Sequence, residues 1–389
     1  MGGVMKLVIL GAGNIATETA QLVRAKFADI KIVIADINLE RAKIVADALK
    51  GSAIAFDASD KESIKTAIKG ADLVFNAVGP FYRYGLRIIK TVIECGINYI
   101  DVCDEYDVTV SLAQDMALNQ AAKDAEVFAL FGMGFSPGIS NLVAKWAYDL
   151  LDTTYDIEIA SVIAYVPTMG MTVNDHMLHS MSGDVPQYVG GKVQYFPAWS
   201  GQKEFTFKEE NGRYQIGYMG HPEGVTLGIF LEDVKNASIR FRWRQDEGNE
   251  IWQSFNRLGL SAFEVSESLP LAPRQYLARF MGSNIGIASL SLQDEAMSNK
   301  TMFQVIAKGE KLGQSCTVII EYHGTNDAGD PTPYAAAAAI SEALNGKITA
   351  KGLIPPEIAI NQAERVAREV LSAVGNRVYF TEKIEAQII

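Results

Sequence analysis

Short apolar runs and amphipathic segments alternate through the first third of the chain. Continuous apolar runs lie at residues 6–10, 31–36, 53–57, 72–79, 98–102 and 126–131. Helical patterns lie between them, at residues 14–26, 38–49, 60–69, 84–95 and 106–124. Strands that are apolar without alternation are typical of a parallel sheet that helices cover on both faces. The pattern predicts a doubly wound α/β domain, which binds ligands beyond the carboxyl ends of its strands.

A different pattern begins near residue 140. Four long β-rich stretches follow, namely "YDIEIASVIAYVP", "KEFTFKEENGRYQIGYMG", "VTLGIFLEDVKNASIRFRWR" and "TMFQVIAKGEKLGQSCTVIIEYHG". The last two carry turn-forming residues near their middles, so we predict hairpins there. These stretches predict a second, α+β domain built on a mixed or antiparallel sheet.

The chain returns to a helical pattern at "TPYAAAAAISEALNG". We predict Thr332 as the N-cap, Pro333 as the first helical residue and Gly346 as the stop. We expect this segment to complete the first domain. The predicted domains are residues 1–139 with 331–375, and residues 140–330.

Composition and charge narrow the classes of partner. A chain of 389 residues, 48% hydrophobic and 21% charged, is typical of a soluble globular protein with two domains. A net charge of -11 argues against a nucleic-acid or anionic-membrane partner. The apolar runs are too short to cross a bilayer, and the start does not have the pattern of a signal peptide.

Cysteine and histidine spacing does not favour a metal. Cys95, Cys103 and Cys316 lack metal-type spacing, and a sparse, odd count is typical of reduced thiols. His176 and His179 lie three residues apart, with no third ligand in sequence reach. We therefore predict a cytoplasmic protein without a metal site.

The loop after the first apolar run has the spacing Gly-x-Gly-x-x-Ala. Gly11 stands at the tight turn, Gly13 where backbone must approach a pyrophosphate, and Ala16 where helix packs on strand. The start of the helix offers N–H groups and a partial positive charge to phosphates. We predict a Rossmann dinucleotide site with Gly11, Gly13, Asn14 and Ile15 as cofactor-binding residues.

An acid follows at the spacing expected for a ribose ligand. Asp36 lies 23 residues after Gly13 and ends the second apolar run. A carboxylate accepts from ribose hydroxyls and repels a 2′-phosphate, so we favour NAD, with NADP as the alternative. Arg41 and Lys43 fall inside the next helical pattern. The structural alternative is that Asp36 only caps the helix that begins near Asn38.

Further cofactor contacts are predicted at the ends of the third and fourth strands. Asp57 either touches the adenine edge or caps the following helix. Asn76, Val78 and Gly79 lie where the ribose and nicotinamide would pass. A plain strand-to-helix loop is the alternative for these three residues.

Several motifs in order resemble one enzyme family. They are "GAGNIA" with Asp36, "NAVGPFYRYG", "YIDVCDE", "GMGFSPGISN", "GHPEGVTL" and "GLIPPE". Together they resemble the saccharopine dehydrogenase-like family, which includes saccharopine reductases, lysine ε-dehydrogenases and carboxynorspermidine dehydrogenases. The resemblance implies a Rossmann domain completed by C-terminal helices, a substrate and dimerisation domain between, and a homodimer. It also implies reversible hydride transfer at a carbon bearing an amine, with NAD or NADP.

One motif departs from the family pattern. Several relatives carry an acid before Pro-Gly at a place facing the active site, and this chain has Ser136 there. A serine cannot hold an ammonium by charge. We therefore expect Ser136 to contact a substrate other than saccharopine, within the same reaction class.

Two loops of the first domain offer chemistry. Cys103 and Asp104 follow the fifth strand, and the resemblance places Asp104 near substrate or nicotinamide; the alternative is that Asp104 and Glu105 cap the next helix. Tyr82 and Arg83 open the helix after the fourth strand and could bind a substrate carboxylate. Packing at the domain boundary is the alternative for this pair.

The second domain contributes an arginine row. Arg240, Arg242 and Arg244 share one face of a strand, because side chains alternate with period two. One of them, for which we choose Arg242, could clamp a carboxylate. The alternative is a solvated face with partner acids such as Glu232 or Glu247.

A histidine in "GHPEGVTL" is the predicted proton carrier. His221 and Glu223 are expected in one turn, and histidine titrates near neutral pH. A purely structural turn is the alternative.

These features predict an NAD(P)-dependent dehydrogenase acting on the CH–NH or CH–NH2 group of a small amino-acid- or polyamine-derived substrate. A lysine ε-dehydrogenase or a carboxynorspermidine-type reductase is the alternative enzyme. A non-catalytic dinucleotide-binding protein is the alternative from another class, to which Ser136 gives some weight.

Overall fold

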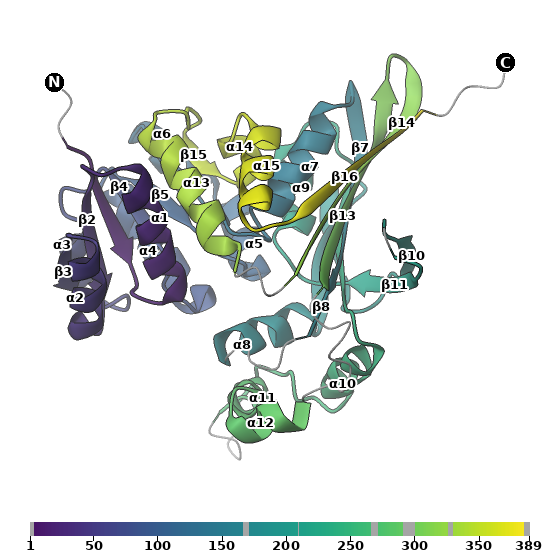
Figure 1. The fold of residues 1–389 in the computed structure, drawn as a ribbon, viewed down its shortest axis with the longest axis horizontal. Coiled ribbons are helices and arrows are strands. Elements are labelled where there is room, and N and C mark those ends of the chain that lie inside the picture. Colours follow the sequence, from purple (N-terminus) through teal and green to yellow (C-terminus); the bar gives the residue numbers. More distant parts are fainter. Residues whose placement is uncertain are drawn as a thin grey trace. The chain divides into compact units, whose positions relative to one another are not determined.

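The computed structural model describes residues 4–165, 171–208, 210–265, 271–290, 300–325 and 330–384. The chain divides into two compact units (Figure 1). Unit 1 comprises residues 1–142 and 330–373, and unit 2 comprises residues 143–329 and 374–389. The predicted β-rich stretches include residues 166–167 and 209, which lie outside the described residues.

Unit 1 is built on a seven-stranded parallel sheet of strand order β15-β6-β5-β4-β1-β2-β3. Its strands are β1 (Lys6–Leu10), β2 (Lys31–Asp36), β3 (Ser52–Ala55), β4 (Leu73–Asn76), β5 (Asn98–Asp101), β6 (Phe128–Leu130) and β15 (Gly352–Ile354). The apolar runs form these strands because both faces of the sheet are buried, as in Leu7, Val8 and Ile9, which are completely inaccessible. The order confirms the predicted Rossmann topology, with its crevice where β1 lies between β2 and β4.

The helices of unit 1 connect these strands. They are α1 (Asn14–Lys26), α2 (Leu39–Ala48), α3 (Lys61–Ile68), α4 (Phe81–Glu94), α5 (Tyr106–Gln114), α6 (Met116–Asp124), α13 (Thr332–Leu344), α14 (Pro356–Ala359) and α15 (Ala363–Ala373). The single helix predicted over 106–124 is wrong, because the chain breaks at Asp115, whose carboxylate accepts from Leu118 N to start α6. Helix α7 (Ile139–Asp149) runs across the boundary at residue 142.

The alanine-rich helix α13 packs against α1 within unit 1. Ala335, Ala336 and Ala339 are fully buried, so small side chains permit this close approach. The predicted cap is wrong: Pro331 occupies the N-cap position, and Thr332 is the first helical residue.

Unit 2 is built on a nine-stranded mixed sheet. Its main path is β10-β11-β12-β7-β13-β14-β16, and β8 pairs with β12 and β9. The strands are β7 (Thr153–Ile163), β8 (Asp184–Val189), β9 (Lys192–Pro197), β10 (Lys203–Thr206), β11 (Arg213–Tyr218), β12 (Asn236–Trp243), β13 (Lys300–Lys311), β14 (Gln314–Thr325) and β16 (Arg377–Ile384). Strands β7 and β12 pair in parallel, whereas the other paired strands are antiparallel. The predicted hairpin of β13 and β14 is confirmed.

The other predicted hairpin of unit 2 is wrong in its first half. That half forms helix α9 (Glu223–Phe230), which packs against β12 and β8. Six of its eight residues are buried, so an apolar run without helical periodicity resembles a strand in sequence. The other helices of unit 2 are α8 (Met171–Ser180), α10 (Asp246–Arg257), α11 (Pro273–Met281) and α12 (Asn284–Leu290).

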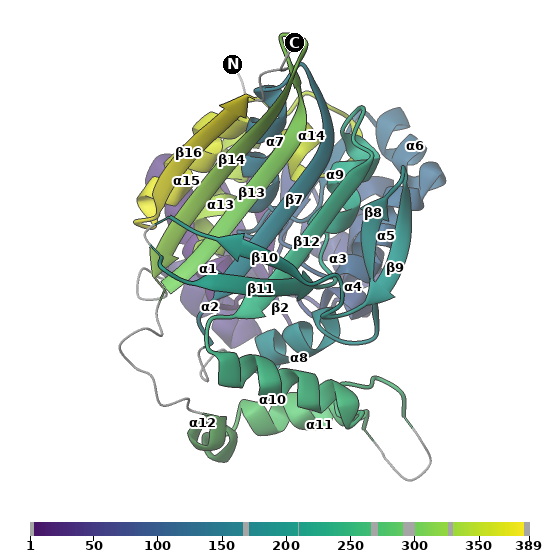
Figure 2. The ribbon, with the colours of Figure 1, turned by 90° about the vertical axis from the view of Figure 1, so that its right-hand side faces the viewer.

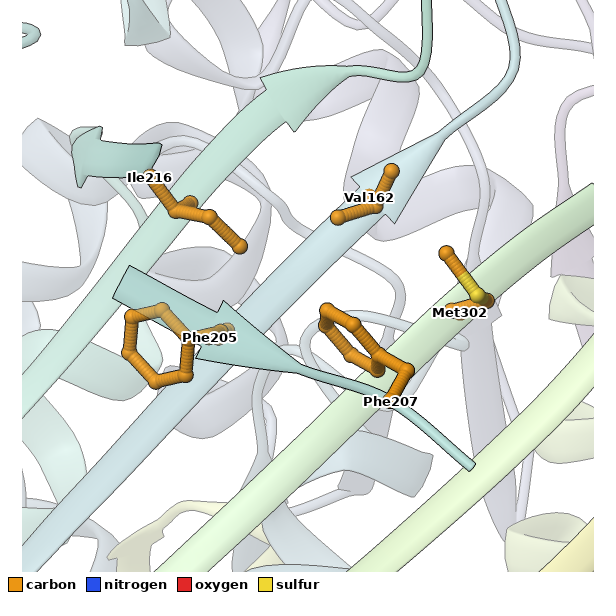
Figure 3. Packing of buried hydrophobic residues seen from close by; sticks show 6 residues of the cluster. Val162, Phe205, Phe207, Ile216 and Met302 are labelled. Atoms are coloured by element: carbon orange, nitrogen blue, oxygen red, sulfur yellow. The ribbon is translucent and has the colours of Figure 1, made fainter. Parts of the chain in front are cut away.

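The hairpin of β10 and β11 crosses one face of the unit 2 sheet (Figure 2). Figure 3 shows Phe205 and Phe207 packed with Val162 and Met302 of the underlying strands, in a cluster that includes Ile216. Burial of one phenylalanine contributes roughly 1.5–3 kcal/mol, so this cluster holds the hairpin on the sheet.

Candidate functional site

The glycine loop at the end of β1 is tightly confined. Gly11 has a φ of +99°, which favours glycine. A Cβ there would lie 3.3 Å from the carbonyl oxygen of Ala77 and 3.4 Å from Cγ2 of Val78. Gly11 N donates to Ala35 O at 2.7 Å. The loop therefore passes between the ends of β2 and β4 with bare backbone, as the predicted pyrophosphate site requires.

Helix α1 begins directly after this loop. Gly13 occupies its N-cap position and has no side chain to cap the first amides, while Asn14 is exposed and Ile15 half-buried. Uncapped N–H groups at a helix start attract phosphate. A Cβ on Gly13 would lie 3.5 Å from Nη2 of Arg41, so the guanidinium reaches this loop from α2.

Asp36 joins the end of β2 to the glycine loop. Its Oδ2 accepts from Ala12 N at 2.7 Å, and its Oδ1 accepts from Asn38 N at 2.8 Å. Helix α2 is capped by Asn38, whose Oδ1 accepts from Arg41 N at 3.1 Å. The capping alternative for Asp36 is therefore wrong, and the carboxylate lies beside the loop predicted to bind the cofactor.

Asp57 closes a local turn after β3. Its Oδ1 accepts from Ser59 N at 2.8 Å and Ser59 Oγ at 2.7 Å, and the hydrogen bond from the Ser59 hydroxyl lowers the pKa of Asp57. Asp60 caps α3 by accepting from Glu62 N, so the capping alternative for Asp57 is wrong. The adenine contact of Asp57 stays a prediction.

The end of β4 carries the predicted nicotinamide-side contacts. Asn76 ends the strand and is fully buried, whereas Val78 is half-buried and Gly79 is exposed. Asn76 Nδ2 donates to the Tyr99 hydroxyl at 2.9 Å, and Tyr99 donates to Asp101 Oδ2 at 2.8 Å. This network is not among the sequence predictions. Its signal was the pair of polar residues two apart, Tyr99 and Asp101, on one face of a buried strand.

The loop after β5 holds an enclosed thiol. Cys103 is 1% exposed, and burial, together with the charges of Asp101, Asp104 and Glu105, raises the pKa of its thiol well above the usual value. The thiol is therefore neutral at physiological pH. Asp104 is half-buried. Glu105 stands at the N-cap position of α5, but among the described residues its carboxylate does not cap the first turn, so that alternative is wrong for Glu105.

The first turn of α4 presents Tyr82 and Arg83. Tyr82 is half-buried and Arg83 is exposed. The Arg83 guanidinium lies over the Tyr84 ring, 5.2 Å from its centroid. The predicted role of this turn in binding a carboxylate stays a prediction.

Ser136 lies in a compact loop after β6. Gly138 has a φ of +122°, and its N–H donates to Asn141 Oδ1 at 3.0 Å. Asn141 Nδ2 donates to Glu357 Oε2 at 2.9 Å, within the buried interior of unit 1. The motifs "GFSPGISN" and "GLIPPE" thus meet, and this contact supports the loop that presents the half-buried Ser136.

Arg240 and Arg242 of the arginine row lie on β12, Arg244 directly follows the strand, and all three side chains are largely enclosed. Arg240 is 7% exposed, forms an ion pair with Glu158 of β7, and places its guanidinium 4.4 Å from the centroid of the Tyr218 ring. Arg242 forms an ion pair with Asp246, whose side chain is 88% exposed. The alternative of a solvated sheet face is wrong for Arg240, whereas the partner of Arg242 is exposed to solvent.

Arg244 follows the same pattern as Arg240. Its side chain is 6% exposed and lies 2.9 Å from an oxygen of Glu210. The predicted partner acids, Glu232 and Glu247, are wrong. The acids that pair with Arg240 and Arg244 come from distant strands and loops, which the sequence does not mark, whereas Asp246 lies four residues after Arg242.

His221 and Glu223 form a buried dyad in unit 2. The His221 Nδ1 is hydrogen-bonded to a carboxylate oxygen of Glu223, which is completely buried at the start of α9. The ring of His176 packs edge-on against His221, with centroids 5.7 Å apart. A carboxylate on one ring nitrogen fixes the tautomer and orientation of the imidazole, which suits proton transfer at the other nitrogen.

A cavity of about 700 Å³ lies elsewhere in unit 1. Its lining includes Lys6 and Lys31, the first residues of β1 and β2. It therefore opens at the amino ends of these strands, opposite the glycine loop. This cavity is distinct from the predicted cofactor site.

Comparisons with known proteins agree with this geometry. Residues 7–130 match the family model described as saccharopine dehydrogenase NADP binding domain. A carboxyaminopropylagmatine dehydrogenase from Synechocystis is 28% identical over 151 residues, 36% of this chain and 37% of the relative. A lipid droplet localized protein from Caenorhabditis elegans is 26% identical over 106 residues, 27% of this chain and 24% of the relative. The matches thus span less than two fifths of these curated relatives.

One solved structure aligns with nearly the entire chain. The saccharopine dehydrogenase (L-Glu forming) from Saccharomyces cerevisiae matches with a TM-score of 0.62 and 14% identity, covering 98% of this chain and 100% of that one. At this identity the likeness shows the fold, which confirms the predicted Rossmann domain with a second sheet domain. Among the described residues, none of the helices is long and apolar enough to span a membrane.

Proposed function

We propose an oxidoreductase function on the premise that residues 7–130 match the saccharopine dehydrogenase NADP binding domain family. The proposed reaction is hydride transfer between NAD(P) and a carbon bearing an amine. The bound nicotinamide supplies the hydride acceptor or donor. The residues of this chain bind the dinucleotide, orient the substrate and transfer the proton.

The geometry around Gly11 is the observation that carries this proposal. Bare backbone at the end of β1, an uncapped helix start at Gly13 and a carboxylate from β2 at Asp36 lie side by side. A pyrophosphate would bind at the bare backbone and the uncapped helix start, and a ribose would bind at the carboxylate.

We propose NAD as the preferred coenzyme. Asp36 would accept from both ribose hydroxyls and repel a 2′-phosphate. NADP is the alternative, and the reach of Arg41 toward Gly13 supports it, because a guanidinium can bind a phosphate.

The proposed substrate is a small amino-acid- or polyamine-derived compound with an amine and a carboxylate. The Synechocystis relative is named a dehydrogenase of carboxyaminopropylagmatine, and that name indicates a compound with a carboxylate and an amine. The name therefore supports this class of substrate. Arg83 and Arg242 are the proposed carboxylate ligands, and Ser136 a neutral contact. Lysine and carboxynorspermidine-type compounds remain the alternative substrates of the same class.

We propose His221 as the proton carrier, oriented by Glu223. A His221→Gln variant should lower kcat by roughly 10²–10⁴-fold, because general acid–base catalysis is lost. The limb of the pH–rate profile that depends on the imidazole should disappear, while coenzyme affinity is retained. His323→Gln is the matched control, since His323 also pairs with an acid, Glu321, at 3.2 Å. Equal losses in both variants would count against a catalytic role for His221.

A turnover assay tests the proposed function itself. The purified chain is mixed with NAD or NADP and a panel of amino acids, polyamines and their carboxyalkyl derivatives, and reduced nicotinamide is followed by absorbance. Semialdehyde–amine pairs with NADH or NADPH test the reverse direction. Steady turnover with one member supports the proposal. Clear coenzyme binding without turnover across the panel supports the non-catalytic alternative.

We also propose a homodimer, which the family resemblance implies. Light scattering should give twice the mass of one chain. A monomeric mass at micromolar concentration would contradict this part of the proposal.

A further inference from the structure

Three buried polar side chains form a continuous hydrogen-bonded row across β4 and β5. Asn76 and Tyr99 are completely inaccessible, and Asp101 is 2% exposed. Asn76 pairs in register with Asp101, and Tyr99 precedes Asp101 by two residues, so all three share one face of the sheet. The donor order runs from Asn76 Nδ2 to Tyr99 Oη at 2.9 Å, and from Tyr99 Oη to Asp101 Oδ2 at 2.8 Å.

Both ends of this row hold loop backbone. At one end, Asn76 Oδ1 accepts from Val78 N at 3.0 Å. At the other, Asp101 Oδ1 accepts from Cys103 N at 3.0 Å and from Gly132 N at 2.7 Å. This row of hydrogen-bonded side chains therefore fixes the loops that follow β4, β5 and β6.

Those three loops carry the residues predicted for the nicotinamide half of the cofactor and for the substrate. They include Val78 and Gly79 after β4, Asp104 after β5 and Ser136 after β6. In a doubly wound fold, the strands β1 to β3 serve the adenosine half of a dinucleotide and the strands on the other side of the switch point serve the nicotinamide half. The glycine loop and Asp36 belong to the first half.

We infer that the row Asn76–Tyr99–Asp101 is a positioning element for the nicotinamide half of the site, separate from the glycine loop that holds the adenosine half. This inference rests on the proposed NAD(P)-dependent function. The three residues are positioning residues, because Asn76 and Asp101 hold loop backbone and Tyr99 joins them. Burying polar groups costs free energy that apolar residues at the same positions would not cost. The need to fix the geometry of these loops accounts for the polar row.

A Tyr99→Phe variant tests the inference, since it removes one hydroxyl and disconnects Asn76 from Asp101. Affinity for NADH should fall about tenfold, as expected for the loss of hydrogen bonds within a buried network. Affinity for ADP-ribose, which lacks the nicotinamide, should stay within about twofold. Dissociation constants come from calorimetry, and circular dichroism confirms the fold.

Tyr165→Phe is the matched control. Tyr165 is 5% exposed in unit 2, and burial raises the pKa of its hydroxyl to about 12. This variant removes the hydroxyl of another buried tyrosine, away from the row, and it should leave both affinities unchanged. A merely destabilising effect of Tyr99→Phe would weaken both ligands in proportion, and that outcome overturns the inference.

An Asp101→Asn variant gives a second, independent reading. The amide nitrogen would face the Tyr99 hydroxyl, which then meets donors from both sides and loses its acceptor. The ratio of the NADH to the ADP-ribose dissociation constant should rise by about tenfold or more. In the double variant with Tyr99→Phe the two effects should be less than additive, because both changes break the same row.

The outcomes separate this inference from the proposed function. If the wild-type chain binds neither NADH nor ADP-ribose, the proposed function fails. If the wild-type chain binds both but Tyr99→Phe and Asp101→Asn keep the wild-type ratio of the two dissociation constants, only the positioning role is overturned.

Discussion

Asp101 in unit 1 and Glu210 in unit 2 are enclosed carboxylates whose pKa values shift in opposite directions. Burial raises the pKa of Asp101 to about 6, and hydrogen bonds from Gly132, Cys103 and Tyr99 offset only part of that rise. Burial also acts to raise the pKa of Glu210, but hydrogen bonds and charges from Arg244 and Lys300 outweigh it, so its pKa is lowered.

The difference lies in what holds each acid. Neutral donors place the Asp101 carboxylate without cancelling its charge, so the ionised form costs stability at neutral pH. Cations beside Glu210 cancel its charge and favour the ionised form. Unit 1 therefore uses a buried acid to fix the backbone of the loops after β5 and β6, whereas unit 2 uses paired acids to support its sheet.

The largest expected effect comes from removing the cation in unit 2. Arg244→Met leaves Glu210 with the neutral Tyr214 hydroxyl and with Lys300, whose side chain is 47% exposed. The free energy of unfolding should fall by about 3 kcal/mol, because one partner of an enclosed ion pair loses its compensation. Urea denaturation measures the change.

Two further variants serve as controls for Arg244→Met. Arg213→Ala breaks an exposed pair with Glu204, 75% and 43% exposed, and should change stability by less than about 1 kcal/mol. Adding Glu210→Gln to Arg244→Met should restore part of the loss. A loss in Arg244→Met no larger than that of Arg213→Ala would show that the enclosed pair does not stabilise unit 2.

The ionisation of Asp101 should change the free energy of unfolding with pH by an amount similar to the effect of Arg244→Met. Its folded pKa of about 6 exceeds the unfolded value of 3.8, so the native state binds more protons between these two values. The stability contribution of this group is fully present below about pH 4 and is lost as pH rises through about 6, by roughly 3 kcal/mol. Glu210, with its lowered pKa, acts in the opposite sense and loses its contribution on acidification.

A difference measurement isolates this effect. The unfolding free energy of the wild type minus that of Asp101→Asn should decrease as pH rises from 4 to 7, because all other titrating groups are shared. Tyr99, Cys103, Asp104 and Glu105 are the titratable groups that surround this carboxyl. The exposed Asp47, replaced by asparagine, is the control for the loss of a surface carboxylate. An increasing difference for Asp101→Asn would contradict the assigned sign.

The glycine loop offers a sharper test of unit 1. Gly11→Ala adds a Cβ at a positive φ and 3.3 Å from Ala77 O, so the loop must shift. Affinity for NADH should fall on the order of 100-fold. Gly96→Ala also places an alanine at a positive φ, +66°, but with open space around it, and it should retain coenzyme binding. Equal binding by both variants would remove Gly11 from the cofactor site.

Asp36→Ala should give the smallest change. Affinity for NADH should fall about tenfold with loss of the ribose hydrogen bonds, while affinity for NADPH is largely retained. Asp47→Ala, on the adjacent helix α2, is the control for a general change in charge. A parallel loss for both coenzymes would assign Asp36 to loop structure alone, through its bond to Ala12 N.

The sequence predicts unit 1 better than unit 2 for a physical reason. Parallel strands buried on both faces leave continuous apolar runs, and strand ends bring Gly11 and Asp36 together without long-range information. Helix α9 is buried on all sides and therefore has no amphipathic period that separates it from a strand. The break at Asp115 depends on one capping side chain within a continuous helical pattern.

Pairings across the unit 2 sheet carried no local signal. Arg240 meets Glu158 from a strand 82 residues away, and Arg244 meets Glu210 across 34 residues. Period two placed the arginines on one face, but partner choice depends on strand order and register. The row Asn76–Tyr99–Asp101 left one local sign, the polar pair Tyr99 and Asp101, but its meaning depends on β4 lying beside β5.

Titration of the purified chain with NADH and NADPH at neutral pH tests the central claim most directly. The account predicts saturable binding of one nucleotide per chain, with a dissociation constant in roughly the 1 μM–1 mM range and tighter binding of NADH. Absence of binding by either coenzyme to the folded protein would contradict the assignment of the β1–α1 loop as a dinucleotide site.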